Sequence, residues 1–212
     1  MLLREFRSDW KDATGEFQTR CYDSYERYLE HQKSKLETHE FGNYDTEFRA
    51  ALRNRLVALD LDWSGRSVLC LGARIGTEVK AFLDLGCFAI GVDLNPGPQN
   101  PYVVQGDFHD LKFAPKSIDL VYTNSLDHAF DLDRIAKEVL KVLKHNGLFI
   151  VEAVHGTDQG INPGFFESFF WKDVNGLIGL FEKAGFTVVC RNPIEFPWPG
   201  EALLFKTRRN AA

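Results

Sequence analysis

Short apolar runs alternate with amphipathic spacers through the last two thirds of this 212-residue chain. Runs of strand length occur at Ser67–Leu71, Ala89–Val92, Tyr102–Gln105, Ile118–Thr123 and Leu148–Glu152. The spacers Thr77–Leu85 and Leu132–Leu143 are predicted to be helices, because apolar residues recur in them every three to four positions. Strands that alternate with helices are typical of βαβ units around a buried, mostly parallel sheet.

The end of the chain carries two further predicted strands, Phe186–Cys190 and Ala202–Lys206. Only the eleven residues Arg191 to Glu201 separate them, and three of these are prolines. A parallel crossover needs about a dozen residues or more, usually with a helix, which these prolines forbid. The fold class predicted is therefore α/β: a doubly wound, mostly parallel seven-stranded sheet with an antiparallel final strand.

The first 63 residues lack the β-branched runs of strands, so we expect an N-terminal helical cap (1–63) on a main domain (64–212). One helix is predicted from Gln18 to Leu36, a turn at Phe41–Tyr44, and a second helix capped near Asp45. Tyrosines recur along the first helix and are expected to pack the cap onto the main domain, the alternative being substrate contact. We expect the cap to cover a ligand bound at the carboxyl ends of the strands.

Composition limits the functions that this chain can have. Hydrophobic residues make up 44% and charged residues 26%, with a formal net charge of −5. No basic excess supports binding to nucleic acid or to an anionic membrane. No run approaches the ~18 apolar residues of a membrane span, and the charged start argues against a signal peptide. The four cysteines form no C-x-x-C pair, so we expect a cytoplasmic protein with reduced thiols; its oligomeric state stays open.

The first candidate site follows the first predicted strand. Gly72 and Gly76 punctuate a turn into a helix, and Asp93 stands twenty-one residues past Gly72, at the end of the second strand. A carboxylate there can accept hydrogen bonds from both ribose hydroxyls of a nucleoside-containing cofactor. The three-glycine dinucleotide signature is absent, because Arg74 stands at its middle position.

Five segments together carry a family resemblance: SVLCLGARIGTEV, GVDLNP, VVQGDFHDLKF, SIDLVYTNSLDH and EVLKVLKHNGLFIVE. They resemble successive motifs of class I S-adenosylmethionine-dependent methyltransferases of the small-molecule type. The resemblance spans about Ser67 to Lys206, and it departs from the family at Cys70 and at Gly72-Ala-Arg74. It implies S-adenosylmethionine as cofactor and methyl transfer to an oxygen or nitrogen atom of a small-molecule acceptor.

The resemblance also implies which residues contact the cofactor. Those expected beside its methionine and ribose are Gly72, Ala73, Arg74, Gly76 and Asp93, with Arg74 on the carboxylate or in solvent. Glu78 would meet the amino group indirectly or cap the helix. Those expected around the adenine are Leu94, Asn95, Gly106, Asp107 and Phe108, although Asp107 is alternatively a loop cap. Asn124, Ser125 and Leu126 would close the far side.

Asp127 and His128 are the catalytic candidates, because they follow the fourth strand beside the expected methyl group. A base is needed only if the acceptor loses a proton, and an imidazole has a suitable pKa. His128 alternatively caps the next helix, and His155 and His109 are weaker candidates. No His-x-His or His-Glu-x-x-His spacing occurs, so no metal site is predicted.

The stretch from Gly156 to Trp171 is rich in aromatic residues. It is expected to wall an acceptor pocket or to be core, and core is favoured because Phe166, Phe169 and Phe170 have helical spacing. Two other functions remain open. The atypical first motif permits a catalytically inactive S-adenosylmethionine-binding protein. A nicotinamide-dependent oxidoreductase is disfavoured by the antiparallel end of the sheet.

Overall fold

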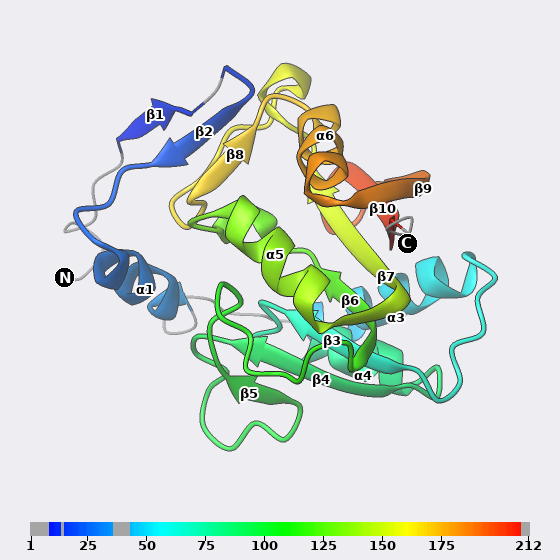
Figure 1. The fold of residues 1–212 in the computed structure, drawn as a ribbon. Helices are drawn as coiled ribbons and strands as arrows, with labels where there is room; N and C mark the ends of the chain where they lie inside the picture. Colours follow the sequence, from blue (N-terminus) through cyan, green and yellow to red (C-terminus); the bar gives the residue numbers. More distant parts are fainter. Residues whose placement is uncertain (1–8, 14, 36–42, 209–212) are drawn as a thin grey trace.

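The computed structural model describes residues 9–13, 15–35 and 43–208 (Figure 1). A seven-stranded sheet in the order β5-β4-β3-β6-β7-β10-β9 forms its centre. The strands are β3 (Ser67–Leu71), β4 (Phe88–Asp93), β5 (Val103–Gln105), β6 (Ile118–Thr123), β7 (Leu143–Val154), β9 (Phe186–Ile194) and β10 (Gly200–Thr207). The helices between them are α4 (Thr77–Leu83), α5 (Leu132–Val142) and α6 (Val174–Ala184). The predicted fold class is confirmed.

Strand direction changes only at one end of this sheet. β3 pairs in parallel with β4 and β6, and β6 pairs in parallel with β7. β10 runs antiparallel to both β7 and β9. The antiparallel pair predicted from the short, proline-rich connection is therefore confirmed.

Side chains of β3 point alternately to two apolar layers, because successive residues of a strand face opposite ways. Leu69 and Leu71 belong to a cluster with α5 and α6 on one face. Val68 and Cys70 belong to a cluster with α4 and α3 (Tyr44–Val57) on the other. The central strands are thus covered on both faces, which explains why they read as continuous apolar runs.

The segment before α3 departs from the prediction. The chain forms β1 (Trp10–Asp12), β2 (Phe17–Arg20) and only then α1 (Tyr25–Lys33). A helix starting at Gln18 is therefore wrong, because β2 pairs with the distant strand β8 (Phe169–Trp171), and this tertiary pairing overrides the local pattern. Most of the predicted turn Phe41–Tyr44 lies outside the described residues. Asp45 lies within α3 and accepts hydrogen bonds from Thr77 Oγ1 and Lys80 Nζ.

The aromatic stretch before α6 combines both expected roles and is not helical. Phe169, Phe170 and Trp171 are buried and form β8, and Phe170 and Trp171 also line a cavity. Successive side chains of a strand point to opposite faces, so the three- to four-residue spacing of Phe166, Phe169 and Phe170 does not place them on one helical face. Phe165 and Phe166, in the preceding loop, are half-buried.

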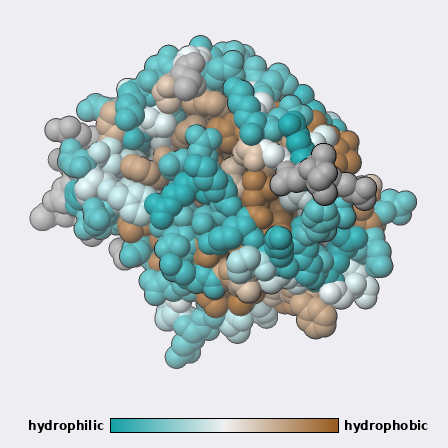
Figure 2. Space-filling view, viewed as in Figure 1, coloured by the Kyte–Doolittle hydropathy of each residue, from teal (hydrophilic) through white to brown (hydrophobic). Residues whose placement is uncertain are grey.

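Hydrophilic side chains cover most of the face seen in Figure 2, and apolar surface shows mainly near its middle. Within the described residues, no helix combines the length and apolar character that crossing a membrane requires. The four cysteines are free thiols, and Cys70 and Cys87 are buried.

Candidate functional site

The loops after β3, β4 and β6 meet at one edge of the sheet, because these neighbouring strands are parallel. After β3, Gly72, Arg74 and Gly76 have φ values of 67°, 40° and 83° and reverse the chain into α4. A Cβ on Gly72 would lie 2.7 Å from the Ser125 Cβ, so this position needs glycine for space as well as for φ. The close neighbour of Gly76 is the Tyr102 side chain, not a cavity.

Two adjoining cavities lie at this edge, and the smaller has a volume of about 40 Å³. Its lining residues are Gln32, Lys35, Gly72, Arg74, Asp93, Leu94, Asn95, Phe108, Ser125 and His128. Asp93 accepts hydrogen bonds from the backbone N–H groups of Arg74 (2.8 Å) and Asn95 (2.9 Å). Burial raises the pKa of Asp93, and these two hydrogen bonds oppose the shift.

A larger cavity of about 430 Å³ adjoins it. The two cavities share the lining residues Lys35, Arg74, Ser125 and His128. The larger one adds the aromatic side chains of Tyr44, Phe170, Trp171 and Trp198 and the acidic ones of Asp127, Glu152 and Glu167. Asn124 and Leu126 also line it. Glu152 is paired with Arg55 at 2.7 Å.

Some residues expected at the cofactor line neither cavity: Ala73, Gly76, Glu78, Gly106 and Asp107. Asp107 accepts a hydrogen bond from Tyr25 Oη of α1 (2.5 Å) and contacts His109 Nδ1 (2.9 Å). His109 Nε2 in turn accepts from the backbone N–H of Phe130 (3.0 Å), so Nδ1 is the donor to Asp107. This network attaches α1 to the loop after β5. The backbone N–H of His109 also donates to Asp107 Oδ1 at 2.8 Å, the contact that a loop cap makes.

Glu78 is buried directly behind the larger cavity. Its Oε1 accepts a hydrogen bond from Asn124 Nδ2 (3.2 Å), while Oε2 has no hydrogen-bond partner among the described residues. Burial raises the pKa of Glu78 to about 7, although the charge of Arg74 opposes the shift. Glu78 thus reaches the cavity only through Asn124.

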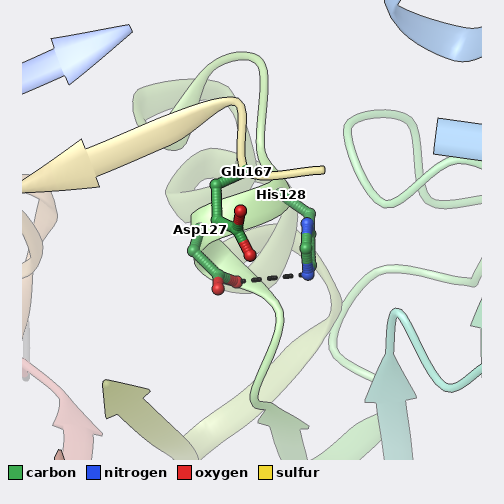
Figure 3. A group of neighbouring side chains, drawn as sticks. All are labelled: Asp127, His128 and Glu167. Atoms are coloured by element: carbon green, nitrogen blue, oxygen red, sulfur yellow. Dashed lines mark ion pairs between the residues drawn. The ribbon is translucent and has the colours of Figure 1, made fainter. Parts of the chain in front are cut away.

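Asp127 and His128, from the short 3₁₀ helix η2 (Leu126–His128), converge with Glu167 from the loop before β8 (Figure 3). Their side-chain donor atoms lie within 4.8 Å of one another, an arrangement that can hold a cation. Asp127 Oδ1 and Glu167 Oε2 are shielded from solvent, and neither has a hydrogen-bond partner in the described part of the chain. Burial raises the pKa of Asp127 to about 6, and the charge of Lys35 opposes the shift.

Both ring nitrogens of His128 are engaged. Nδ1 lies 3.0 Å from the carbonyl oxygen of Phe166, which can only accept, so Nδ1 carries the proton. Nε2 accepts a hydrogen bond from Lys35 Nζ at 2.5 Å. Burial first, and then the charge of Lys35, holds the pKa of His128 well below its usual range. Burial lowers the pKa of Lys35 to about 8, so at pH 7 its side chain is mostly an ammonium.

The N-terminal segment holds the loop that carries Glu167. The buried side chain of Arg20 donates to the carbonyl oxygens of Glu167 (2.8 Å) and Gly164 (2.7 Å). Gln32 Nε2 donates to the carbonyl oxygen of Phe166 (2.8 Å), and Tyr28 Oη to that of His128 (3.0 Å). Sequence reasoning missed Gln32, Lys35 and Glu167, since no local pattern indicates contacts made across more than 90 residues. His155 lines neither cavity.

Comparisons with known proteins agree with this geometry. A family model described as a methyltransferase domain matches residues 69–151. A Burkholderia thailandensis 1,6-didemethyltoxoflavin-N1-methyltransferase structure has a TM-score of 0.67 at 16% identity, covering 95% of this chain and 100% of its own. A Haloferax volcanii structure, solved with the Trm112 methyltransferase activator, has a TM-score of 0.65 at 19% identity, covering 85% of this chain and 98% of its own.

A third structure, an S-adenosylmethionine-dependent methyltransferase from Aquifex aeolicus, has a TM-score of 0.64 at 11% identity, covering 82% of this chain and 98% of its own. A search of curated proteins found no match. Identities this low show that the fold is shared.

Proposed function

Because this chain carries a class I S-adenosylmethionine-dependent methyltransferase domain, we propose that it methylates an oxygen or nitrogen atom of a small-molecule acceptor bound in the larger cavity. The observation that carries this proposal is the junction of the two cavities. They share Ser125 and His128, which follow β6, so ligands in the two cavities would lie side by side. Methyl transfer needs this proximity, since the acceptor atom must approach the methyl carbon in line.

The chemistry of the smaller cavity fits S-adenosylmethionine, the cofactor of this domain. Asp93 offers a carboxylate suited to ribose hydroxyls, and Leu94 and Phe108 offer apolar surface for an adenine. The cavity of about 40 Å³ is far below the ~300–1,000 Å³ of ligand sites. Gln32 and Lys35 line it from the N-terminal segment, so cofactor binding requires these side chains to shift. When bound, the cofactor supplies an electrophilic methyl group on a sulfonium.

Asp127 is the proton acceptor in this proposal. An O–H or N–H group of the acceptor would give its proton to Asp127 as its oxygen or nitrogen attacks the methyl carbon. Bound S-adenosylmethionine would supply that methyl group, and the electron pair of its broken C–S bond would stay on sulfur, giving S-adenosylhomocysteine. Three observations support Asp127: it lines the larger cavity, its Oδ1 has no hydrogen-bond partner among the described residues, and burial raises its pKa to about 6. His128 is less suited, because Lys35 and Phe166 engage both its nitrogens.

The aromatic walls of the larger cavity suit a flat acceptor. Tyr44, Phe170 and Trp198 surround the space, and Glu167 Oε2 offers a second hydrogen-bond acceptor beside Asp127. The Burkholderia thailandensis structure is named as an N1-methyltransferase, so acceptors with N–H groups, heterocycles among them, are one class to test.

Turnover assays test the proposal. Purified protein and S-adenosylmethionine would be incubated with phenols, aliphatic amines and N–H heterocycles, and S-adenosylhomocysteine release would be followed. We expect at least one class to raise release above the background without acceptor. Binding of S-adenosylhomocysteine with no turnover on any class would favour the catalytically inactive alternative.

A further inference from the structure

A basic side chain of the N-terminal segment reaches the cluster formed by Asp127, His128 and Glu167. Lys35 follows α1, lines both cavities, and donates from Nζ to His128 Nε2 at 2.5 Å. Lys33, two positions earlier, is exposed. The end of α1 therefore directs one particular lysine into the site, where its ammonium is largely removed from water.

The cluster that Lys35 meets requires positive charge. Asp127 and Glu167 each hold a solvent-shielded oxygen without a hydrogen-bond partner in the described residues. Carboxylates withdrawn from water are costly unless a cation compensates them. Figure 3 shows both carboxylates pointing toward the His128 ring, and the donor atoms of the three side chains lie within 4.8 Å of one another. One imidazole and two carboxylates are a donor set that Mn²⁺ accepts.

The cluster is also held in advance of any ligand. His128 donates from Nδ1 to the Phe166 carbonyl, which turns the Nε2 lone pair toward Lys35. The backbone N–H of Ser168 donates to the Asp127 carbonyl at 2.7 Å, which ties the Glu167 loop to η2. The Nε2 atom of His128 accepts a hydrogen bond, and the two carboxylates lie beside it, so the three side chains together form a site suited to a cation.

We infer that the Lys35 ammonium is the resident cation of this cluster, in the place that a divalent metal ion would otherwise take, and that its charge compensates the two carboxylates that face the methyl acceptor. Lys35 is thus a positioning residue. It acts through Asp127 and Glu167, which are left to accept hydrogen bonds from an acceptor's N–H or O–H groups. This statement about the acceptor rests on the proposed function, whereas the identity of the cation does not.

The inference predicts that removing the ammonium opens the site to a metal ion. Mn²⁺ would be titrated into the full chain at pH 7.5, with free Mn²⁺ measured by electron paramagnetic resonance. We expect Lys35→Met to bind one Mn²⁺ at least tenfold more tightly than the wild type. Lys33→Met removes the same charge from the exposed side of α1 and should behave as the wild type. Adding Glu167→Gln to Lys35→Met should abolish the gain.

Two results would overturn the inference. Wild-type protein that binds Mn²⁺ as tightly as Lys35→Met would show that Lys35 does not fill the site. A normally melting Lys35→Met variant without a gain would show that the cluster is not built around a cation. If Lys35→Met does not fold, Lys35→Gln replaces it in the same titration. Tight Mn²⁺ binding by the wild type would contradict the inference without either variant. Because no arm measures methyl transfer, the outcome does not depend on whether the proposed function is correct.

Discussion

The sheet and the N-terminal segment contribute to the same site in different ways. The sheet supplies the residues that follow β3, β4 and β6, so backbone geometry alone brings Gly72, Asp93 and Ser125 to one edge. The segment of residues 9–13 and 15–35 supplies side chains that reach in from outside, among them Gln32 and Lys35. The sheet fixes where the site lies, and the N-terminal segment adds polar and charged side chains to its lining.

The difference shows in how each region is held. β3 is paired along its length with two neighbouring strands. α1 has side-chain contacts instead: the buried ring of Tyr28 packs against His109 and Phe130, and Tyr25 donates a hydrogen bond to Asp107. Because no backbone pairing within the described residues holds the end of this segment, where Gln32 and Lys35 lie, we expect that end to be the part of the site that moves when ligands enter.

The largest expected effect belongs to the sheet side of the comparison. Asp127→Asn keeps the size of the side chain but removes the proton acceptor, and should slow methyl transfer about 10²–10⁴-fold once an acceptor is known. Single-turnover rates at saturating cofactor measure this. His128→Gln is the matched control and should slow the reaction less; a larger loss in His128→Gln than in Asp127→Asn would return the base to His128.

On the N-terminal side, Tyr28→Ala tests whether α1 is part of the folded core. Tyr28 is fully buried, and truncating such an aromatic side chain costs about 3–5 kcal/mol. Phe149→Ala, which removes an equally buried ring from β7, should cost about as much in urea unfolding. If only Phe149→Ala lowers the free energy of unfolding and Tyr28→Ala leaves it unchanged, α1 is not part of the folded core.

The sheet was predictable from sequence because its pattern is local. Ser67–Leu71 and Ile118–Thr123 are mostly apolar and form β3 and β6 with the predicted bounds. Asp93 and Ser125 follow from the rule that parallel strands end together, and both line a cavity. β2 and β8 escaped prediction, since both are very short and each is defined by its distant partner.

The rest of the site could not be predicted for the same reason. Lys35 and Glu167 meet His128 only because Arg20 and Gln32 fasten the loop before β8 to the N-terminal segment. Asp107 matches the family motif, but no motif indicated that it accepts a hydrogen bond from Tyr25 of α1. Sequence patterns indicate where strands end but not which side chains cross between elements.

The pH dependence of the free energy of unfolding tests the burial of Glu78, on the sheet side of the site. Its pKa is raised to about 7 in the folded protein from 4.5 in a free carboxyl, so the folded state holds the proton more tightly. The contribution of Glu78 to the free energy of unfolding is therefore fully present below pH 4.5. It falls as the pH rises through 7, by about 3 kcal/mol at most. Glu78→Gln should remove this loss, being more stable than wild type at pH 8 and similar at pH 4.5 in urea unfolding. Equal stabilities at pH 8 would contradict a buried, charged Glu78.

A smaller effect would sharpen the contrast in mobility. Binding of S-adenosylhomocysteine should slow amide hydrogen exchange in α1 by about fivefold or more, because Gln32 and Lys35 line the smaller cavity. Exchange in α6, which lines neither the smaller nor the larger cavity, should stay unchanged. Protection confined to the loops of the sheet would show that the N-terminal segment does not cover the cofactor.

A cofactor site at the end of β4 can be measured by calorimetric titration of S-adenosylhomocysteine into the wild type and Asp93→Ala. We expect the wild type to bind one molecule per chain and to show no comparable binding of NAD, and Asp93→Ala to bind S-adenosylhomocysteine at least tenfold more weakly. This loss corresponds to one hydrogen bond to a charged group, about 1.5–3 kcal/mol. Asp93→Ala should also lower the melting temperature, because the backbone N–H groups of Arg74 and Asn95 lose their acceptor. Affinity that survives the loss of Asp93 unchanged would contradict a cofactor site at the end of β4.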